Sequence, residues 1–87
     1  MKADEARIER MLKTARGQID GILKMVEEDR YCVDISNQIL ATQSILNKVN
    51  HDLLRAHLDH CVRDAFEHGA EQEKIDELLL LFDRIKD

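Results

Sequence analysis

"ISNQILATQSILNKVNHDLLRAHLDH", residues 35–60, places an apolar or small residue at alternating steps of four and three, which is the spacing of one face of an α-helix. The members of this stripe are Ile35, Ile39, Thr42, Leu46, Val49, Leu53, Ala56 and His60. Neither Pro nor Gly interrupts the chain between Tyr31 and His68, so the helix can run for about three times the usual length. A helix that long needs a partner of similar length.

Two shorter stripes flank this long helix. Upstream, the residues Ile8, Leu12, Ala15, Ile19, Ile22 and Val26 predict a helix over roughly residues 4–28. Gly17 and Gly21 fall inside it at a cost of about 1 kcal/mol each, so we expect a neighbouring backbone to approach them closely. Downstream, Gly69 is a natural helix stop, and a third, short helix follows, with apolar residues at Ile75, Leu78, Leu79, Phe82 and Ile85.

Three helices of such unequal length cannot cover one another within one chain. We therefore predict an all-α fold, with residues 1–87 forming a single domain whose long helix pairs antiparallel with its copy in a homodimer. The first helix of each chain would lie alongside, which makes a four-helix core. At 87 residues the domain is small enough to need such a partner, a metal or a disulfide for stability.

The composition indicates the compartment of the protein, the role of its two cysteines and the kind of partner it binds. The N-terminus is charged and the longest apolar run, residues 78–82, is too short to span a bilayer, so we expect a cytoplasmic protein. Two cysteines in a reducing compartment favour free thiols, metal ligands or a redox sensor over a disulfide framework. The net charge of −5 argues against nucleic acid as a partner, but basic residues are in surplus in the first helix and the middle of the second. A solvated helix face would give the same surplus.

His57 and Cys61 lie one helical turn apart, so their side chains share a face and can share a metal ion. Cys32 lies 25 residues before His57, which is roughly 38 Å along a continuous helix, so it cannot reach them within its own chain. Antiparallel pairing about an axis near residues 44–46 places Cys32 of one chain opposite His57 and Cys61 of the other. The dimer then carries two equivalent sites.

Two thiolates and one imidazole form a soft, three-coordinate ligand set, which suits Cu(I) best. Zn(II) would usually take a fourth ligand, for which His60 or water is available. A structural interpretation stays open beside the metal one, because cysteine is among the most frequently buried residue types.

Three segments carry a resemblance to a known family. "DRYCVDI" at residues 29–35, "HLDHCV" at 57–62 and "RGQIDGI" at 16–22 resemble the copper-sensing repressors of the CsoR/RcnR/FrmR family, over essentially the whole chain. The resemblance implies small all-helical dimers that pair into tetramers and bind operator DNA without a helix-turn-helix.

The resemblance also implies roles for individual residues. In the copper-sensing branch, Cys32, His57 and Cys61 match the metal ligands, and Tyr31 and Glu77 match a network that hydrogen-bonds around the metal-binding His. Nickel and cobalt sensors of the family have a His in place of Cys61. Formaldehyde sensors need only the first Cys, and persulfide sensors lack the His. The complete ligand set favours copper.

For DNA contact the match is less complete. Many members carry an Arg where this chain has Met11, flanked here by Arg10 and Lys13. Lys48 matches a basic position that contacts DNA in the family, and Arg16 is a further candidate.

The resulting hypothesis is a Cu(I)-responsive repressor, not an enzyme, that leaves operator DNA when Cu(I) binds and so releases copper-export genes. The alternatives are a thiol-responsive, persulfide-responsive or Ni/Zn-responsive repressor of the same family, and a helical copper-binding protein with no DNA role.

Overall fold

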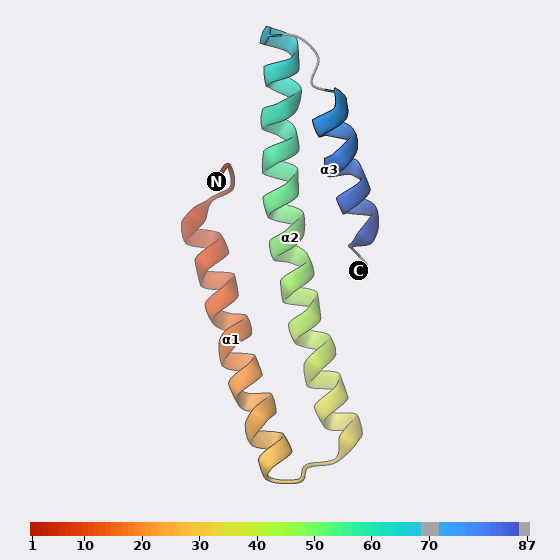
Figure 1. Ribbon diagram of the computed structural model, residues 1–87. Coiled ribbons are helices and arrows are strands. Elements are labelled where there is room, and N and C mark those ends of the chain that lie inside the picture. The colour runs from red at the N-terminus through yellow and green to blue at the C-terminus, as the bar shows by residue number, and fades with distance from the viewer. Residues whose placement is uncertain (69–71, 86–87) are drawn as a thin grey trace.

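The computed structural model describes residues 1–68 and 72–85, and these form three helices and no strand. The helices are α1 (Glu5–Glu27), α2 (Cys32–His68) and α3 (Gln72–Arg84). Helix α1 lies antiparallel along the first part of α2, and α3 returns along its second part (Figure 1). The predicted all-α class is confirmed, and the observed ends of α1 and α2 lie within one residue of the predicted ones.

Local capping explains where α1 begins and how the chain turns into α2. The side chain of Asp4 accepts a hydrogen bond of 3.2 Å from the backbone N–H of Arg7, which satisfies one of the free donors at the helix start. At the other end, Asp29 adopts the left-handed conformation with φ of 53°. The N–H of Arg30 then donates to the carbonyl of Met25 at 3.0 Å, which closes the helix end.

Helix α2 begins immediately after this turn. The carbonyl of Tyr31 accepts the N–H groups of Asp34 at 3.0 Å and Ile35 at 3.2 Å, so the first helical hydrogen bonds start there. Cys32 is consequently the first residue of α2. From that point α2 continues without a break for 37 residues, as the uninterrupted stripe predicts.

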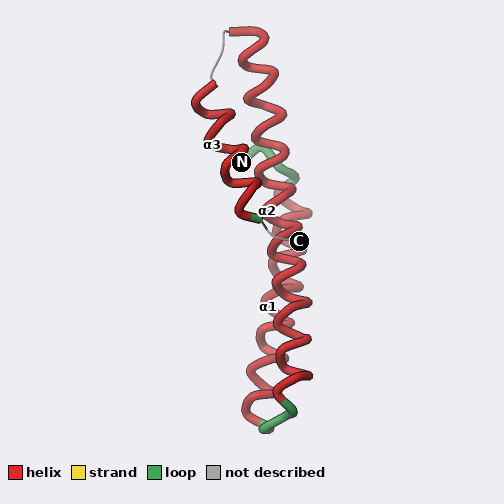
Figure 2. Tube along the Cα trace, turned by 90° about the vertical axis from the view of Figure 1, so that its right-hand side faces the viewer, coloured by secondary structure: helices red, strands yellow, loops and turns green. Residues whose placement is uncertain are grey.

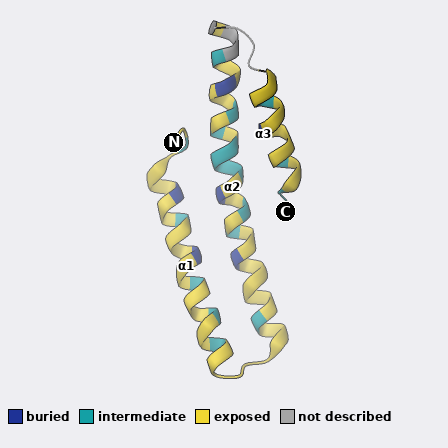
Figure 3. Cartoon of the chain, in the orientation of Figure 1, coloured by how far each residue is buried: buried dark blue, intermediate teal, exposed yellow. Residues whose placement is uncertain are grey.

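Helices α1 and α2 are joined by a small apolar core with one polar contact inside it. Ile8 and Ala15 of α1 and Val49 of α2 are buried, and Figure 3 shows the buried positions on the sides where the two helices face each other. Thr42 is 5% exposed, and its hydroxyl donates to Oε1 of Gln18 at 2.7 Å. This hydrogen bond fixes how the two helices are aligned.

The three helices form a single layer. The principal extents are 57 × 25 × 13 Å, and 13 Å is about the thickness of one helix with its side chains; the side view in Figure 2 shows the same narrow outline. A stable domain normally packs at least two layers around its core. The predicted stripe of α2 is therefore split: Thr42 and Val49 are buried, whereas Ile39 and Leu46 stay 42% and 41% exposed.

Two expectations from the sequence are wrong within one chain. A Cβ added at Gly17 or Gly21 would meet no atom within 4 Å, so no neighbour in the same chain approaches these glycines closely. His60, which we expected to pack as part of the apolar stripe, is exposed. The N-terminal residues lie beside residues 52–59 of α2 and leave His60 uncovered. Among the described residues, no helix is both long and apolar enough for a bilayer crossing.

Candidate metal centre

The three predicted metal ligands all lie on α2, but in different surroundings. Cys32 is exposed at the start of the helix, and His57 is exposed in its second half. Cys61 is only 4% exposed, in the half of α2 along which α3 lies (Figure 1). His57 and Cys61 are one turn apart on an unbroken helix, whereas Cys32 is about 38 Å from His57 along the axis.

The described residues of one chain do not assemble a metal site. No three of their His, Cys, Asp and Glu side chains come together in an arrangement that would hold a metal ion. This agrees with the geometry of α2, since a straight helix keeps Cys32 away from the other two residues. Any site that contains all three needs a second copy of the chain.

The three ligands nevertheless share one side of α2. Twenty-five residues are about seven full turns at 3.6 residues per turn, so Cys32 and His57 point in nearly the same direction. Ile39 and Leu46, which follow Cys32 at steps of seven residues, point the same way and are large apolar side chains left exposed. Cys32 and His57 therefore lie on the side of α2 that neither α1 nor α3 covers, whereas Cys61, one turn after His57, is buried at the edge of that side.

The two residues expected to support the imidazole lie at opposite ends of the long helix. Tyr31 precedes α2 and is 68% exposed. Glu77 is an exposed residue of α3, next to the buried Leu78 that anchors α3. Helix α3 lies along the half of α2 that carries His57 (Figure 1), so Glu77 belongs to the His57 end and Tyr31 to the Cys32 end.

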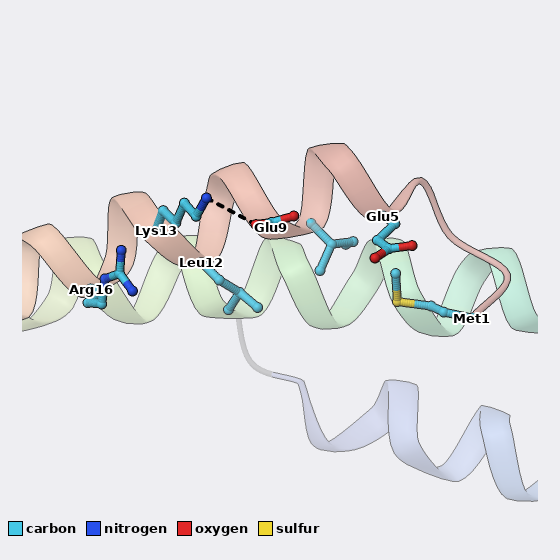
Figure 4. Close-up of a pocket in the computed structure, with 7 residues that line it drawn as sticks. Met1, Glu5, Glu9, Leu12, Lys13 and Arg16 are labelled. Atoms are coloured by element: carbon cyan, nitrogen blue, oxygen red, sulfur yellow. Dashed lines mark ion pairs between the residues drawn. The ribbon is translucent and has the colours of Figure 1, made fainter.

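The predicted DNA-binding residues do not form one cluster. Lys13 pairs with Glu9 at 3.0 Å on the side of α1 that carries Leu12 and Arg16 (Figure 4). Lys48 lies in a different recess, formed by α2 and the start of α1. Arg10 follows Arg7 by three residues and is exposed on α1.

The residue that sequence reasoning missed is Arg7. Its Nε lies 2.9 Å from Oδ2 of Asp52, and it lines the same recess as Lys48. Nothing in the local sequence marks Arg7, because its partner is 45 residues away. A weak signal was present: Arg7 lies one turn before Met11, the position that the family resemblance expects to be basic.

Comparison with known proteins identifies the family. A family model described as a metal-sensitive transcriptional repressor matches residues 4–84. The chain belongs to this family. Its members are transcriptional repressors and not enzymes.

Individual relatives in the family are similar over most of this chain. A copper-sensing transcriptional repressor CsoR of Bacillus subtilis is 46% identical over 79 residues, which are 91% of this chain and 78% of that protein. The CsoR of Mycobacterium ulcerans is 48% identical over 68 residues, which are 78% of this chain. This chain spans 58% of the length of that second relative.

Two solved structures share the fold of this repressor chain. The copper-sensing repressor CsoR with Cu(I) from Geobacillus thermodenitrificans has a TM-score of 0.79 and 39% identity, and the match covers 91% of this chain and 82% of that one. The nickel-responsive transcriptional regulator InrS has a TM-score of 0.83 and 26% identity, covering 99% and 97%. The same three-helix fold thus occurs in a copper sensor and a nickel sensor, so the metal must be argued from the ligands.

Proposed function

We propose that this protein is a cytoplasmic Cu(I)-responsive repressor that binds operator DNA without metal and leaves it when Cu(I) binds. The observation that carries the proposal is the placement of Cys32 and His57 on one uncovered side of α2, with the buried Cys61 one turn after His57. The identity of nearly half the residues with relatives named as copper-sensing repressors supports the metal.

The metal site would form between two protomers. If α2 packs antiparallel against its copy through Ile39 and Leu46, Cys32 of one protomer comes opposite His57 and Cys61 of the other. The packing also buries apolar side chains that a single layer of helices leaves in water. One contact then serves both stability and metal binding. Dimers that pair further into tetramers are part of the same proposal.

The donor set selects among metals. Thiolate and imidazole ligands with no carboxylate among them favour Cu(I), which accepts three-coordinate geometry, over Ni(II) and Zn(II), which usually require four or more ligands. Cys61 is almost fully buried, so a metal ion bound to its thiol would be partly shielded from water, the remaining source of a fourth ligand. The three residues present therefore fit Cu(I).

Metal binding would change the DNA-binding surface through a movement of α3. Tyr31 of one protomer and Glu77 would orient the His57 imidazole by hydrogen bonds. Glu77 lies in α3 five residues before Phe82, whose ring meets that of His51 edge to face at 5.5 Å. His51 lines the recess of Lys48. A shift of α3 on metal binding would therefore move a residue beside the DNA-contacting lysine.

Operator contact would use Lys48 together with Arg10, Lys13 and Arg16. Such cations bind the phosphate backbone, so DNA affinity should fall steeply with salt concentration. By thermodynamic linkage, DNA must weaken Cu(I) binding by the same factor by which Cu(I) weakens DNA binding.

The test begins with a DNA duplex that the metal-free protein selects from a randomised library. Fluorescence anisotropy then measures its affinity with and without one equivalent of Cu(I) per chain. We expect Cu(I) to lower the affinity by about 5- to 150-fold, the usual range of allosteric coupling, and Cys32→Ala to bind the duplex normally but ignore Cu(I). Release of the Cys32→Ala protein by copper would contradict the ligand assignment.

The same experiment separates the rival functions. A helical copper-binding protein with no DNA role would bind Cu(I) but select no duplex. A persulfide-responsive repressor would leave the duplex after treatment with a sulfide donor, with a mass increase that reports sulfur between Cys32 and Cys61 of different chains. Mass spectrometry in parallel with anisotropy distinguishes all three.

A further inference from the structure

The ion pair between Arg7 and Asp52 joins the start of α1 to the middle of α2. Arg7 Nε donates to Oδ2 of Asp52 at 2.9 Å, and the two side chains are 57% and 36% exposed. This contact uses Nε alone, so the two terminal nitrogens of the guanidinium keep their N–H donors for another acceptor. An ion pair this exposed is weak, and a stronger anion can compete for the arginine.

A recess of about 460 Å³ lies beside this pair, lined by Arg7, Ser44, Asn47, Lys48, His51 and Asp52. Lys48 is exposed and makes no ion pair with any part of the chain that the structure describes. The recess therefore combines two fixed positive charges with one carboxylate, together with hydroxyl, amide and imidazole groups. A phosphate oxygen is the natural ligand of an arginine and a lysine that converge in this way.

The position of the recess on α2 keeps it accessible in an assembled dimer. Lys48 follows Ile39 by nine residues, which is two and a half turns at 3.6 residues per turn, so the two side chains point to opposite sides of α2. The apolar side that would pack against a second copy is thus turned away from the recess. Arg55, seven residues after Lys48, continues the basic line on the same side. The carboxylates of Asp4 and Asp59 lie in the neighbouring recess, beyond the ion pair.

We propose that this recess binds a phosphate of the operator backbone through Lys48 and Arg7, and that Asp52 competes with the phosphate for Arg7. The inference rests on the proposed function, since it assigns additional residues to the DNA contact. Asp52 would hold Arg7 in position in the free protein and lower the DNA affinity. The carboxylate thereby keeps binding weak enough for a metal signal to reverse it.

The test compares Arg7→Gln, Asp52→Asn and the double variant with the unchanged protein, all metal-free, on the selected duplex at several salt concentrations. We expect Arg7→Gln to lower the affinity several-fold and to reduce the salt slope by about one for each phosphate that the variant no longer neutralises. Asp52→Asn should raise the affinity by about two- to fivefold. In the double variant the gain from Asp52→Asn should disappear.

Arg30 and Glu28 provide a matched control. They form an exposed pair at 3.8 Å just beyond the other end of α1. That end is about 30 Å from Arg7 along the helix, beyond the range of screened charges. Arg30→Gln and Glu28→Gln make the same charge changes and should alter the affinity less than twofold. Equal effects at the two pairs would show that only net charge matters and would overturn the proposal.

Two further results would also overturn it. An Asp52→Asn gain that persists without Arg7 would mean that Asp52 acts by repelling DNA and not by competing for the arginine. A change in sedimentation with no change in DNA affinity would assign the recess to subunit contact. The unchanged protein serves as the test of the proposed function in the same titrations: if it selects no duplex or ignores Cu(I), that proposal fails, whatever the variants do.

Discussion

The two sides of α2 differ in what they leave exposed. One side carries Cys32, Ile39, Leu46 and His57, with large apolar side chains left in water and the predicted metal ligands at both ends. The opposite side carries Lys48 and the recess beside it, with charged groups at its rim. Under the proposed function, the first side packs against a second copy of the chain and the second side faces DNA.

This difference has a consequence for signalling. A metal held on one side of a helix cannot touch DNA held on the other side, so occupancy must be transmitted through movement of helices. Helix α3 is placed to transmit it, because it carries Glu77 near the His57 end and contacts His51 near the recess. The two sides can be separated experimentally by variants that affect one of them only.

The largest expected effect comes from mixing two inactive chains. Cys32→Ala and His57→Ala should each abolish tight Cu(I) binding. In a mixed dimer, one site combines the intact Cys32 of the second variant with the intact His57 and Cys61 of the first. Refolding an equal mixture should therefore restore about a quarter of the sites, since half of the dimers are mixed and each has one intact site. Titration with a Cu(I) chelator measures this.

A site formed within one chain would give no restoration on mixing. Mixing either variant with Cys32→Ala/His57→Ala chains is the control, because no mixed dimer then contains a complete site. Restoration in the control would mean that the metal is held by other residues.

The next largest effect is expected at the apolar side. Leu46→Asp places a carboxylate where two copies of α2 would meet, at a cost of about 4 kcal/mol, so association should weaken by about a thousandfold. Val62 is the matched control. It is 40% exposed, against 41% for Leu46, but it follows Leu46 by sixteen positions, which places it on nearly the opposite side of α2.

Sedimentation velocity distinguishes the two variants. Val62→Asp should sediment as the unchanged protein does, and Leu46→Asp should be a monomer at micromolar concentration. If the two variants behaved alike, the assignment of the Ile39 and Leu46 side to the dimer contact would be wrong.

The sequence was sufficient to predict the helices but not which sides of them are covered. The ends of α1 and α2 were predictable because the apolar stripe of α1 runs from Ile8 to Val26 and because no Pro or Gly interrupts residues 31–68. Periodicity alone placed Thr42, Leu46 and Val49 in one stripe. The structure buries Thr42 and Val49 under α1 and leaves Leu46 exposed, which depends on the lateral position of α1.

The candidate site likewise has some features that the sequence predicts and others that depend on how the helices pack. The distance between Cys32 and His57 follows from the length of one helix, so spacing alone predicts that a site containing both residues would need a second chain. The contact of Arg7 with Asp52 depends on how two helices align over 45 residues, and no local pattern encodes that. The expectation that a backbone approaches Gly17 and Gly21 closely was wrong for a related reason. The sequence shows the cost of these glycines to helix stability, but it does not show the open space around them.

A smaller effect is expected on the side of α2 that faces α1. Thr42→Val removes the hydrogen bond to Gln18 inside the core and should lower the free energy of unfolding by about 1 kcal/mol. Thr42→Ser keeps the hydroxyl and should be less destabilising. Thr14→Val is the control, since the Thr14 hydroxyl donates to the carbonyl of Arg10 on an exposed surface. Urea denaturation measures all three, and an equal destabilisation at Thr14 and Thr42 would contradict a specific role for the buried contact.

The smallest effect, and the one with the opposite sign, is expected at the glycines of α1. Gly17→Ala adds a methyl group into open space and restores helix propensity, so the free energy of unfolding should rise by about 1 kcal/mol. That corresponds to about 4–8 °C in Tm for a domain of this size, measured by circular dichroism, and Gly21→Ala should repeat it. A loss of stability would mean that a second protein chain contacts this surface of α1. A gain in stability accompanied by weaker operator binding would instead mean that DNA approaches the helix backbone there, which would extend the charged side of the molecule from α2 onto α1.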